Sequence, residues 1–349
     1  MTSMNSGKIY LILRFSSVGN VAMAVPIIEA ACRLQPDDCF VVVSARRLED
    51  LFYGIKNLSF LTADFTGKRS GYKGIIKLYN EIRKSYKNIA AVIDLQNSFR
   101  TRALRWMFTL SGTKTFHIDN QIPQKRRMLF HGYEKQQPLR TEFERYEMVF
   151  DEARIKTDRD FCRIAINHDA QQHISQHIGV KTGRWIGIAP FAKSKTNMLP
   201  FRTTKELISR LSAEKDTHIF LFGAGEIECT MLAQWASLFD NTTSIAGSMP
   251  LSDELELMRQ LDLMICMDSA NQHLASLVGT RVVSIWCGTH PYIGFYGWKQ
   301  SPNDCLQISV SCRPCTIHGR QYCKYYNYLC QQIKVEEILG KVKSEKLKN

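Results

Sequence analysis

Residues that could bind a charged ligand gather at the end of the apolar run 263–267. The small and polar residues that follow it are Asp268, Ser269, Ala270, Asn271 and His273. A helical pattern begins near His273, and the largely apolar run 281–286 comes next. The region therefore predicts a strand, a turn, a helix and a second, parallel strand. Ligands of such sheets bind beyond the carboxyl ends of the strands, and free N–H groups at a helix start suit a diphosphate. The alternative is that Ser269 only caps the helix and His273 only packs in it.

A second candidate site follows the first predicted strand, residues 8–15. The turn 16–20 contains Ser17, Gly19 and Asn20, and a helix is predicted over 21–34. A strand that leads through a glycine turn into a helix is again an arrangement that can bind a ligand at the end of the strand. The turn lacks the G-x-G-x-x-G pattern of dinucleotide-binding proteins, so it gives little support to a dinucleotide site.

Positive charge gathers near the start of a third helix, predicted over 98–110 after a strand at 90–95. Asn97 precedes this helix, and Arg100 and Arg102 lie in its first turns. Cations at that end oppose the helix dipole, and an anionic ligand would offset them. The alternative is that these arginines are only exposed on a solvated surface.

The order of predicted elements indicates the fold class. Strands and helices alternate through both halves, which is typical of an α/β protein with doubly wound parallel sheets. The polar run 168–181 separates the halves. We therefore expect a first domain over 1–167, a second over 182–330, and a C-terminal helix or tail over 331–349.

Composition narrows the class of protein and its partners. No apolar run approaches a membrane span, and the polar start of the chain lacks the apolar core of a signal peptide, so we expect a cytoplasmic protein. Residues 1–165 carry 27 Lys and Arg against 17 Asp and Glu, a net charge of +10, whereas the rest carries +3. This basic half favours an anionic partner: a phosphorylated glycolipid, an anionic membrane surface or a nucleic acid. A solvated basic surface is the alternative.

Two further segments stand out. The weakly patterned stretch 119–139 contains the basic cluster Lys125, Arg126 and Arg127, and loops of that length are usually functional or disordered. Near the end of the chain lie four cysteines, Cys312, Cys315, Cys323 and Cys330. C-x2-C is a zinc-ligand spacing, but the second pair is wider than structural zinc sites usually allow, so packed free thiols are the preferred reading.

Together these segments resemble glycosyltransferase family 9, the lipopolysaccharide heptosyltransferases. Residues 12–22 look like the family's first strand and turn, 94–100 like its D-L-x-x-x-x-R segment, and 144–146 like its E-R-Y. Residues 268–275 are similar to its D-S/T-G-x-x-H-L-A donor loop, and 312–315 match a C-x-P-C segment common near its end. The resemblance implies the GT-B fold, in which two Rossmann-like, doubly wound domains face a cleft.

The resemblance also implies a reaction and its participants. The reaction is the inverting transfer of a heptose from ADP-heptose to a lipopolysaccharide core or lipid A acceptor, at the cytoplasmic surface of the inner membrane and without a further cofactor. The implied donor-binding residues are Asp268, Ser269, Ala270, Asn271, His273, Glu226 and Glu228. Lys193 and Lys195 would neutralise the charge of the leaving diphosphate. The implied acceptor-binding residues are Ser17, Gly19, Asn97, Arg100, Arg102, Lys125, Arg126 and Arg127.

The sequence departs from the family pattern at three positions. Asn20 occupies the position of the aspartate that is the family's general base, and a carboxamide cannot accept a proton from a hydroxyl at neutral pH. Ala270 stands where the family prefers glycine, and Asn197 stands where it usually has a lysine. A variant of the same fold that binds donor and acceptor with weak or no transfer is therefore the alternative. A nucleic-acid binder that uses the cysteine cluster is disfavoured, because it leaves two α/β halves with strand-end sites unexplained.

Overall fold

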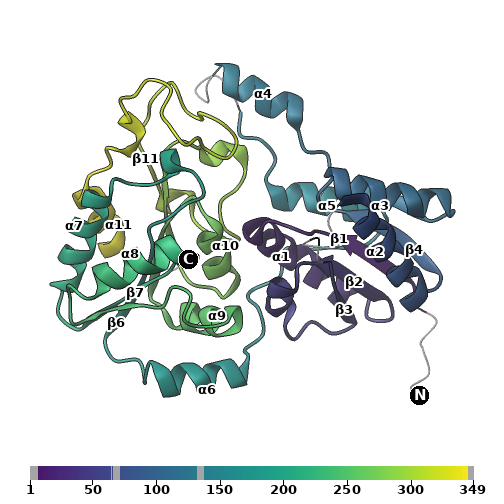
Figure 1. The fold of residues 1–349 in the computed structure, drawn as a ribbon, viewed down its shortest axis with the longest axis horizontal. Coiled ribbons are helices and arrows are strands. Elements are labelled where there is room, and N and C mark those ends of the chain that lie inside the picture. Colours follow the sequence, from purple (N-terminus) through teal and green to yellow (C-terminus); the bar gives the residue numbers. More distant parts are fainter. Residues whose placement is uncertain (1–6, 64, 66–70, 132–136, 345–349) are drawn as a thin grey trace. The chain divides into compact units, whose positions relative to one another are not determined.

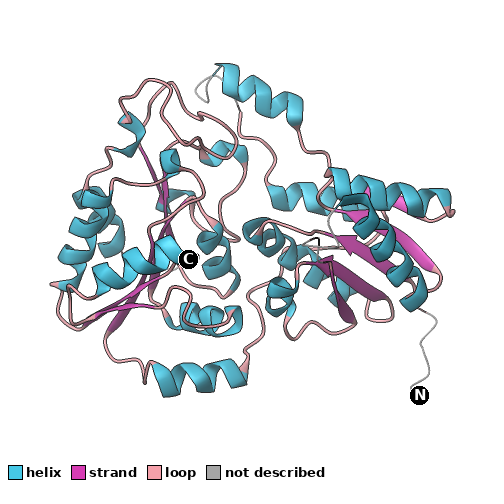
Figure 2. Cartoon of the chain, viewed as in Figure 1, coloured by secondary structure: helices cyan, strands magenta, loops and turns pink. Residues whose placement is uncertain are grey.

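The computed structural model describes residues 7–63, 65, 71–131 and 137–344 (Figure 1). The chain divides into two compact units: the first comprises residues 1–121 and 140–165, and the second comprises 122–139 and 166–349. In each unit helices flank a sheet of parallel strands (Figure 2). Among the described residues, no helix has both the length and the apolar character needed to cross a membrane.

The first unit contains a five-stranded parallel sheet in the order β3-β2-β1-β4-β5. Its strands are β1 (Ile9–Leu13), β2 (Cys39–Ser44), β3 (Leu58–Thr62), β4 (Ile89–Asp94) and β5 (Lys114–His117). Its helices are α1 (Val18–Leu34), the 3-10 helix η1 (Arg46–Phe52), α2 (Gly71–Ser85), α3 (Phe99–Leu110) and α5 (Glu142–Glu152).

Both faces of this sheet are buried, as the apolar strands require. Leu11 and Leu13 of β1 join a core with Leu78 of α2 and Leu104 of α3. The alternate strand residue Ile12 is also fully buried. Side chains alternate between the two faces of a strand, so helices must cover both faces, and a near-continuous apolar run is the sequence of such a strand.

The second unit contains a six-stranded parallel sheet in the order β11-β10-β9-β6-β7-β8. Its strands are β6 (Arg184–Ala189), β7 (Thr217–Leu221), β8 (Thr242–Ser244), β9 (Leu263–Met267), β10 (Val282–Trp286) and β11 (Cys305–Gln307). Its α-helices are α4 (Ile122–His131), α6 (His168–His177), α7 (Phe201–Ser212), α8 (Glu226–Ala236), α9 (Leu251–Gln260), α10 (Ala270–Leu277) and α11 (Val335–Lys343).

Two segments differ from the sequence prediction. Residues 122–139 contain helix α4 and belong by their contacts to the second unit, whereas we predicted a loop of the first domain. The Lys125 ammonium lies 5.5 Å from the ring centroid of Phe295, and the Leu139 N–H donates a 2.8 Å hydrogen bond to the Tyr292 carbonyl. Helix α11 buries Ile338 in the core of the second unit, so this part of the expected tail completes that core.

Candidate functional site

The strand order of the second unit reverses between β6 and β9, which are neighbours in the sheet. From β6 the chain proceeds to β7 and β8 on one side, and from β9 to β10 and β11 on the other. Ala189 at the end of β6 pairs with Cys266 of β9, so the loops after both strands start at the same edge. Open parallel sheets bind ligands at such a reversal. The Lys193 loop follows β6 there, and the Asp268 loop follows β9.

Asp268 directly follows β9 and is held from two sides. Its Oδ1 accepts a 3.1 Å hydrogen bond from Nε2 of Gln272, and its Oδ2 accepts a 2.5 Å hydrogen bond from the Thr289 hydroxyl. Burial raises the pKa of Asp268 to about 6, although both hydrogen bonds act to lower it. The carboxyl group is therefore fixed in position, and its charge changes near pH 6.

Three polar side-chain atoms at the start of α10 lack hydrogen-bond partners. Oγ of Ser269, Oε1 of Gln272 and Nδ1 of His273 are buried and have no hydrogen-bond partner among the described residues. Ser269 is the N-cap of α10, yet its side chain makes no capping bond. Burial lowers the pKa of His273 to about 3, so its imidazole is neutral at physiological pH. Buried polar groups without partners are costly, and a ligand bound at this loop would supply partners for them.

The two remaining residues of this loop form the first turn of the helix. Ala270 is the first residue of α10 and Asn271 the second. Ala270 is not among the residues with positive φ, so the backbone needs no glycine there. Alanine at position 270 is therefore compatible with the loop.

A buried arginine supports the loop that faces Asp268. Arg313 is 1% exposed, and its Nε and Nη2 donate hydrogen bonds of 3.1 and 2.5 Å to the carbonyl of Thr289. Its Nη1 donates a 2.7 Å hydrogen bond to the carbonyl of Ile308. The residue between Cys312 and Pro314 thus fixes the backbone of Thr289, whose hydroxyl in turn holds Asp268.

The loop after β6 carries two exposed cations, Lys193 and Lys195. Asn197 lies in the same loop but is buried, and its Nδ2 donates a 3.3 Å hydrogen bond to the carbonyl of His318. Gly319 has φ of +81°, and a Cβ at that position would collide with the Asn197 side chain. Asn197 therefore packs against the His318 segment, which leaves the two lysines as the charged side chains of the loop.

Helix α8 begins at Glu226, directly after Gly225, which has φ of +89°. Glu226 and Glu228 consequently lie in its first turn, where carboxylates interact favourably with the helix dipole. Oε2 of Glu228 accepts a 3.0 Å hydrogen bond from the Ala224 N–H. Glu228 thus closes its own loop, whereas Glu226 is exposed.

In the first unit, the strand order reverses between β1 and β4, where Leu13 pairs with Asp94. The loops that follow these two strands are joined by Gln96. Its Oε1 accepts hydrogen bonds from the N–H groups of Phe15 at 2.8 Å and Ser16 at 3.3 Å. The two predicted acceptor-side loops thus meet at one sheet edge.

The prediction for the turn after β1 was wrong in one respect. Helix α1 begins at Val18, not at residue 21, so Gly19 and Asn20 belong to its first turn and Ser17 is its N-cap. Tyr146 of α5 donates a 3.1 Å hydrogen bond to the carbonyl of Asn20. Asn20 is partly exposed, and its backbone is thereby tied to the E-R-Y segment.

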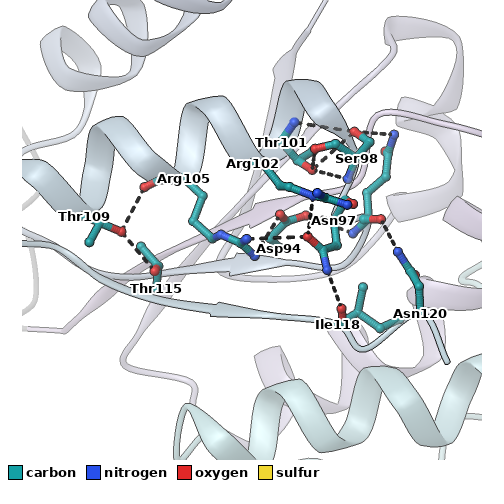
Figure 3. Close-up of polar contacts among 11 residues, drawn as sticks. Asp94, Asn97, Ser98, Thr101, Arg102, Arg105, Thr109, Thr115, Ile118 and Asn120 are labelled. Atoms are coloured by element: carbon teal, nitrogen blue, oxygen red, sulfur yellow. Dashed lines mark hydrogen bonds and ion pairs between the residues drawn. The ribbon is translucent and has the colours of Figure 1, made fainter. Parts of the chain in front are cut away.

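Asp94 is fully buried and organises the loop before α3 (Figure 3). Its Oδ1 accepts hydrogen bonds from the N–H groups of Gln96 at 3.0 Å and Asn97 at 2.8 Å, and its Oδ2 lies 3.3 Å from Nη1 of Arg105. Asn97 has φ of +51°, and its side chain accepts from Arg102 at 3.1 Å. These contacts engage both carboxylate oxygens, so Asp94 fixes the shape of the loop before α3.

The remaining predicted acceptor residues differ in their surroundings. The Arg100 guanidinium is exposed and lies 4.9 Å from the ring centroid of Phe65. Arg126 and Arg127 are exposed on α4, whereas Lys125 is partly buried. Because α4 belongs to the second unit, the predicted acceptor residues are distributed over both units.

The four C-terminal cysteines are all free thiols. Burial raises the pKa of Cys330 to about 11, with further contributions from the neighbouring Cys315, Cys312 and Cys323. In the part of the chain that the structure describes, no three His, Cys, Asp or Glu side chains are grouped so that they could hold a metal ion. The residues as arranged do not fit a zinc site.

A sequence model of glycosyltransferase family 9 (heptosyltransferase) matches residues 75–326, most of the chain. The chain belongs to this family. Each of its two units contains a parallel α/β sheet of the Rossmann-like type found in the GT-B enzymes of family 9, so the predicted family and fold class are confirmed.

Individual relatives within family 9 are distant in sequence. The lipopolysaccharide core heptosyltransferase OpsX of Haemophilus influenzae is 22% identical over 288 residues, which cover 81% of this chain and 80% of that protein. A family 9 glycosyltransferase of Veillonella parvula has a similar structure, with a TM-score of 0.75, 18% identity and 96% coverage of each chain. The E. coli heptosyltransferase WaaC, solved with ADP, has a TM-score of 0.66 and 16% identity over 96% of this chain and 98% of that one.

Sequence reasoning missed several residues that shape both strand-end sites of this family 9 protein. Gln272 and Thr289 bind the carboxylate of Asp268, and Arg313 holds the carbonyl of Thr289. Gln96 joins the loops after β1 and β4. Thr289 could have been noticed because it follows the apolar strand β10, as Asp268 follows β9. Arg313 gave no such signal, because its partner carbonyl lies 24 residues away in the chain.

Proposed function

We propose that this family 9 protein transfers a heptose from ADP-heptose to a phosphorylated lipopolysaccharide core or lipid A acceptor, with inversion at the anomeric carbon. In this reaction the bond from the anomeric carbon to the diphosphate oxygen breaks, and its electron pair leaves with ADP. The acceptor hydroxyl oxygen forms the new bond and loses its proton. The names of the relatives OpsX and WaaC, the latter solved with ADP, support this choice of donor and acceptor.

The observation that carries the proposal is the set of unsatisfied polar atoms at the start of α10. The hydroxyl of Ser269, the amide oxygen of Gln272 and the imidazole of His273 offer donors and acceptors to a polyhydroxylated sugar or its diphosphate. The first N–H groups of α10 have no partners within the helix and point toward the same end. A nucleotide sugar supplies both kinds of partner, whereas a purely structural loop leaves them unsatisfied.

Charge on the departing ADP needs stabilisation as it develops. We assign this role to the N-terminus of α10 and to Lys193 and Lys195, which are exposed on the loop after the neighbouring strand β6. Preorganised dipoles and cations of this kind commonly make the largest single contribution to catalysis. Glu226, exposed at the start of α8, is assigned to the ribose hydroxyls of the nucleotide.

Acceptor phosphates are assigned to the basic residues of α3 and α4. Arg100, Arg102, Arg126 and Arg127 are exposed and can each make charge-assisted hydrogen bonds to a phosphate. Ser17, Gly19 and Asn97 lie at the ends of the two central strands of the first unit, where the sugar hydroxyls of the acceptor would bind. The same basic surfaces suit peripheral contact with an anionic membrane.

Asn20 favours a second candidate, a family member that binds donor and acceptor but transfers slowly or not at all. Asn20 cannot accept the proton of the acceptor hydroxyl, and Asp94 is fully buried against Arg105. A general base contributes about 10²–10⁴-fold to the rate, so its absence slows transfer and leaves binding intact.

A panel of ligands tests the proposed donor. Thermal unfolding is measured with ADP, GDP, UDP and their sugars, including ADP-heptose. A ligand at about 100 times its dissociation constant stabilises the folded protein by about 2.7 kcal/mol. We expect the largest shift with ADP-heptose; a larger shift with a GDP or UDP sugar, or none with any of them, would overturn the assignment.

A further inference from the structure

Helices α2 and α3 of the first unit form an apolar groove on their outer side, which we call the α2–α3 groove. It has a volume of about 380 Å³. Four of its lining residues are largely exposed: Tyr72 (66%), Phe99 (77%), Trp106 (69%) and Leu110 (78%). Three aromatic rings and one further apolar side chain are therefore in contact with solvent at one place.

The core does not require these side chains. Leu78 of α2 and Leu104 and Phe108 of α3 already form the buried faces of the two helices, and the Tyr79 and Phe108 rings pack 4.9 Å apart between them. The exposed residues lie on the opposite, outward faces, where an amphipathic helix normally carries polar residues. Apolar surface gathered in this way marks a site of interaction.

The positive charge of the same two helices favours an anionic partner. Their sequences contain seven Lys and Arg, and Glu81 is the single acidic residue. Four of these cations are exposed: Lys73 and Lys77 of α2, and Arg100 and Arg102 of α3. Arg102 lines the groove itself. Apolar rings flanked by cations match the surface of an anionic bilayer, where Trp and Tyr occupy the headgroup region and Lys and Arg attract acidic lipids.

We infer that the α2–α3 groove is the surface by which this protein docks on an anionic lipid bilayer. Phe99, Trp106 and Leu110 enter the boundary between headgroups and acyl chains, and Lys73 and Lys77 bind acidic headgroups. The inference deepens the proposed function, since the proposed acceptor is a membrane glycolipid. Binding to vesicles requires neither donor nor transfer, so it can fail or succeed independently of the reaction.

Sedimentation with vesicles tests the inference. Full-length protein is mixed with vesicles of phosphatidylcholine alone or of phosphatidylcholine with phosphatidylglycerol, at about 0.1 M and about 1 M salt. We expect binding to the anionic vesicles at low salt, with little binding to neutral vesicles and a marked loss at high salt. Lys73→Ala and Lys77→Ala should each weaken binding about fivefold. The triple variant Phe99→Ser/Trp106→Ser/Leu110→Ser should weaken it at least about tenfold.

Control variants change similar residues elsewhere. Val180 and Leu238 of the second unit are 81% and 61% exposed, so Val180→Ser/Leu238→Ser removes exposed apolar surface outside the groove. Lys215→Ala removes an exposed cation outside it. These variants should bind anionic vesicles as the unmodified protein does, and every variant should keep its thermal unfolding temperature.

Three results would overturn the inference. They are equal binding to neutral and anionic vesicles, unchanged binding by the triple groove variant, and an equal loss in the control variants. Light scattering on the same samples detects the rival occupant, a second copy of this chain. A concentration-dependent dimer that the triple groove variant abolishes, without vesicle binding by the unmodified protein, would assign the groove to self-association instead.

Discussion

The hydroxyl of Thr289 donates a 2.5 Å hydrogen bond to Oδ2 of Asp268. Two loops that follow adjacent strands, β9 and β10, are thereby locked together at the edge where the proposed donor binds. Arg313 in turn donates two hydrogen bonds to the carbonyl of Thr289. The geometry of Asp268 thus depends on a residue 45 positions later in the sequence, because a buried guanidinium fixes the loop between them.

Replacement of Thr289 by valine should weaken donor binding while the fold survives. The substitution leaves Oδ2 of a buried carboxyl group without its donor, at a cost of about 1–3 kcal/mol. We expect a lower unfolding temperature and a weaker affinity for ADP-heptose, measured by thermal unfolding and calorimetric titration. Thr289→Ser keeps the hydroxyl and should restore most of the affinity. Equal affinities for the valine variant and the unmodified protein would exclude a positioning role.

The raised pKa of Asp268 predicts a pH dependence of stability. Burial makes the folded protein favour the protonated form of Asp268. The contribution of this protonated carboxyl to stability is therefore fully present below the ordinary pKa of 3.8 and is lost as the pH rises through about 6. Relative to Asp268→Asn, the unmodified protein should lose about 1–3 kcal/mol of unfolding free energy over this range. Denaturant titrations at several pH values measure the difference. Parallel pH profiles of the two proteins would show that Asp268 ionises normally.

An aspartate at position 20 should accelerate transfer. Asn20 lies in the first turn of α1 with its carbonyl held by Tyr146, so Asn20→Asp introduces a carboxylate onto a fixed backbone. If this turn is catalytic, kcat should rise by about 10²–10⁴-fold, increasing as the new carboxylate ionises, with little change in KM. Steady-state kinetics with donor and acceptor measure the change. A variant no faster than the unmodified protein would assign proton removal to another group.

Asp94→Asn supplies the contrast to Asn20→Asp. Removing one partner of the buried Asp94–Arg105 pair leaves an unpaired charge, which costs about 3–5 kcal/mol of unfolding free energy. We therefore expect a large loss of stability in denaturant titrations. Any residual activity should keep the pH profile of the unmodified protein. A stable Asp94→Asn variant with a specific loss of kcat would instead identify Asp94 as a candidate base.

The parallel strands were predictable because burial on both faces leaves a continuous apolar signal. The run at 263–267 coincides with β9, and the polar residue after it identified Asp268 as a strand-end residue. Helix starts were less predictable: α1 begins at Val18 and α8 at Glu226, since neither Gly19 nor Gly225 contributes to an apolar pattern. Helix α4 escaped notice because its exposed surface is basic and few of its residues are buried.

Only part of the candidate site could be predicted from the sequence, for a related reason. Its strand-end residues follow local patterns, whereas Thr289, Arg313 and Gln96 act through contacts between distant segments. The C-x2-C spacing of Cys312 and Cys315 is compatible with metal ligands, although the sequence favoured packed free thiols. In the structure the buried Arg313 between them makes the polar contacts, and the spacing alone could not distinguish a ligand pair from a turn that buries an arginine.

Calorimetric titration of ADP-heptose into three proteins tests the central claim, a nucleotide-sugar site at the Asp268 loop. The proteins are the unmodified chain, Asp268→Ala, and the control Asp240→Ala, which removes an exposed carboxylate elsewhere in the second unit. Loss of Asp268 releases Gln272 and Thr289, so affinity should fall at least about tenfold, a change of about 1.4 kcal/mol, while the control binds like the unmodified protein. Equal affinities in all three proteins, or no binding by the unmodified chain, would contradict the account.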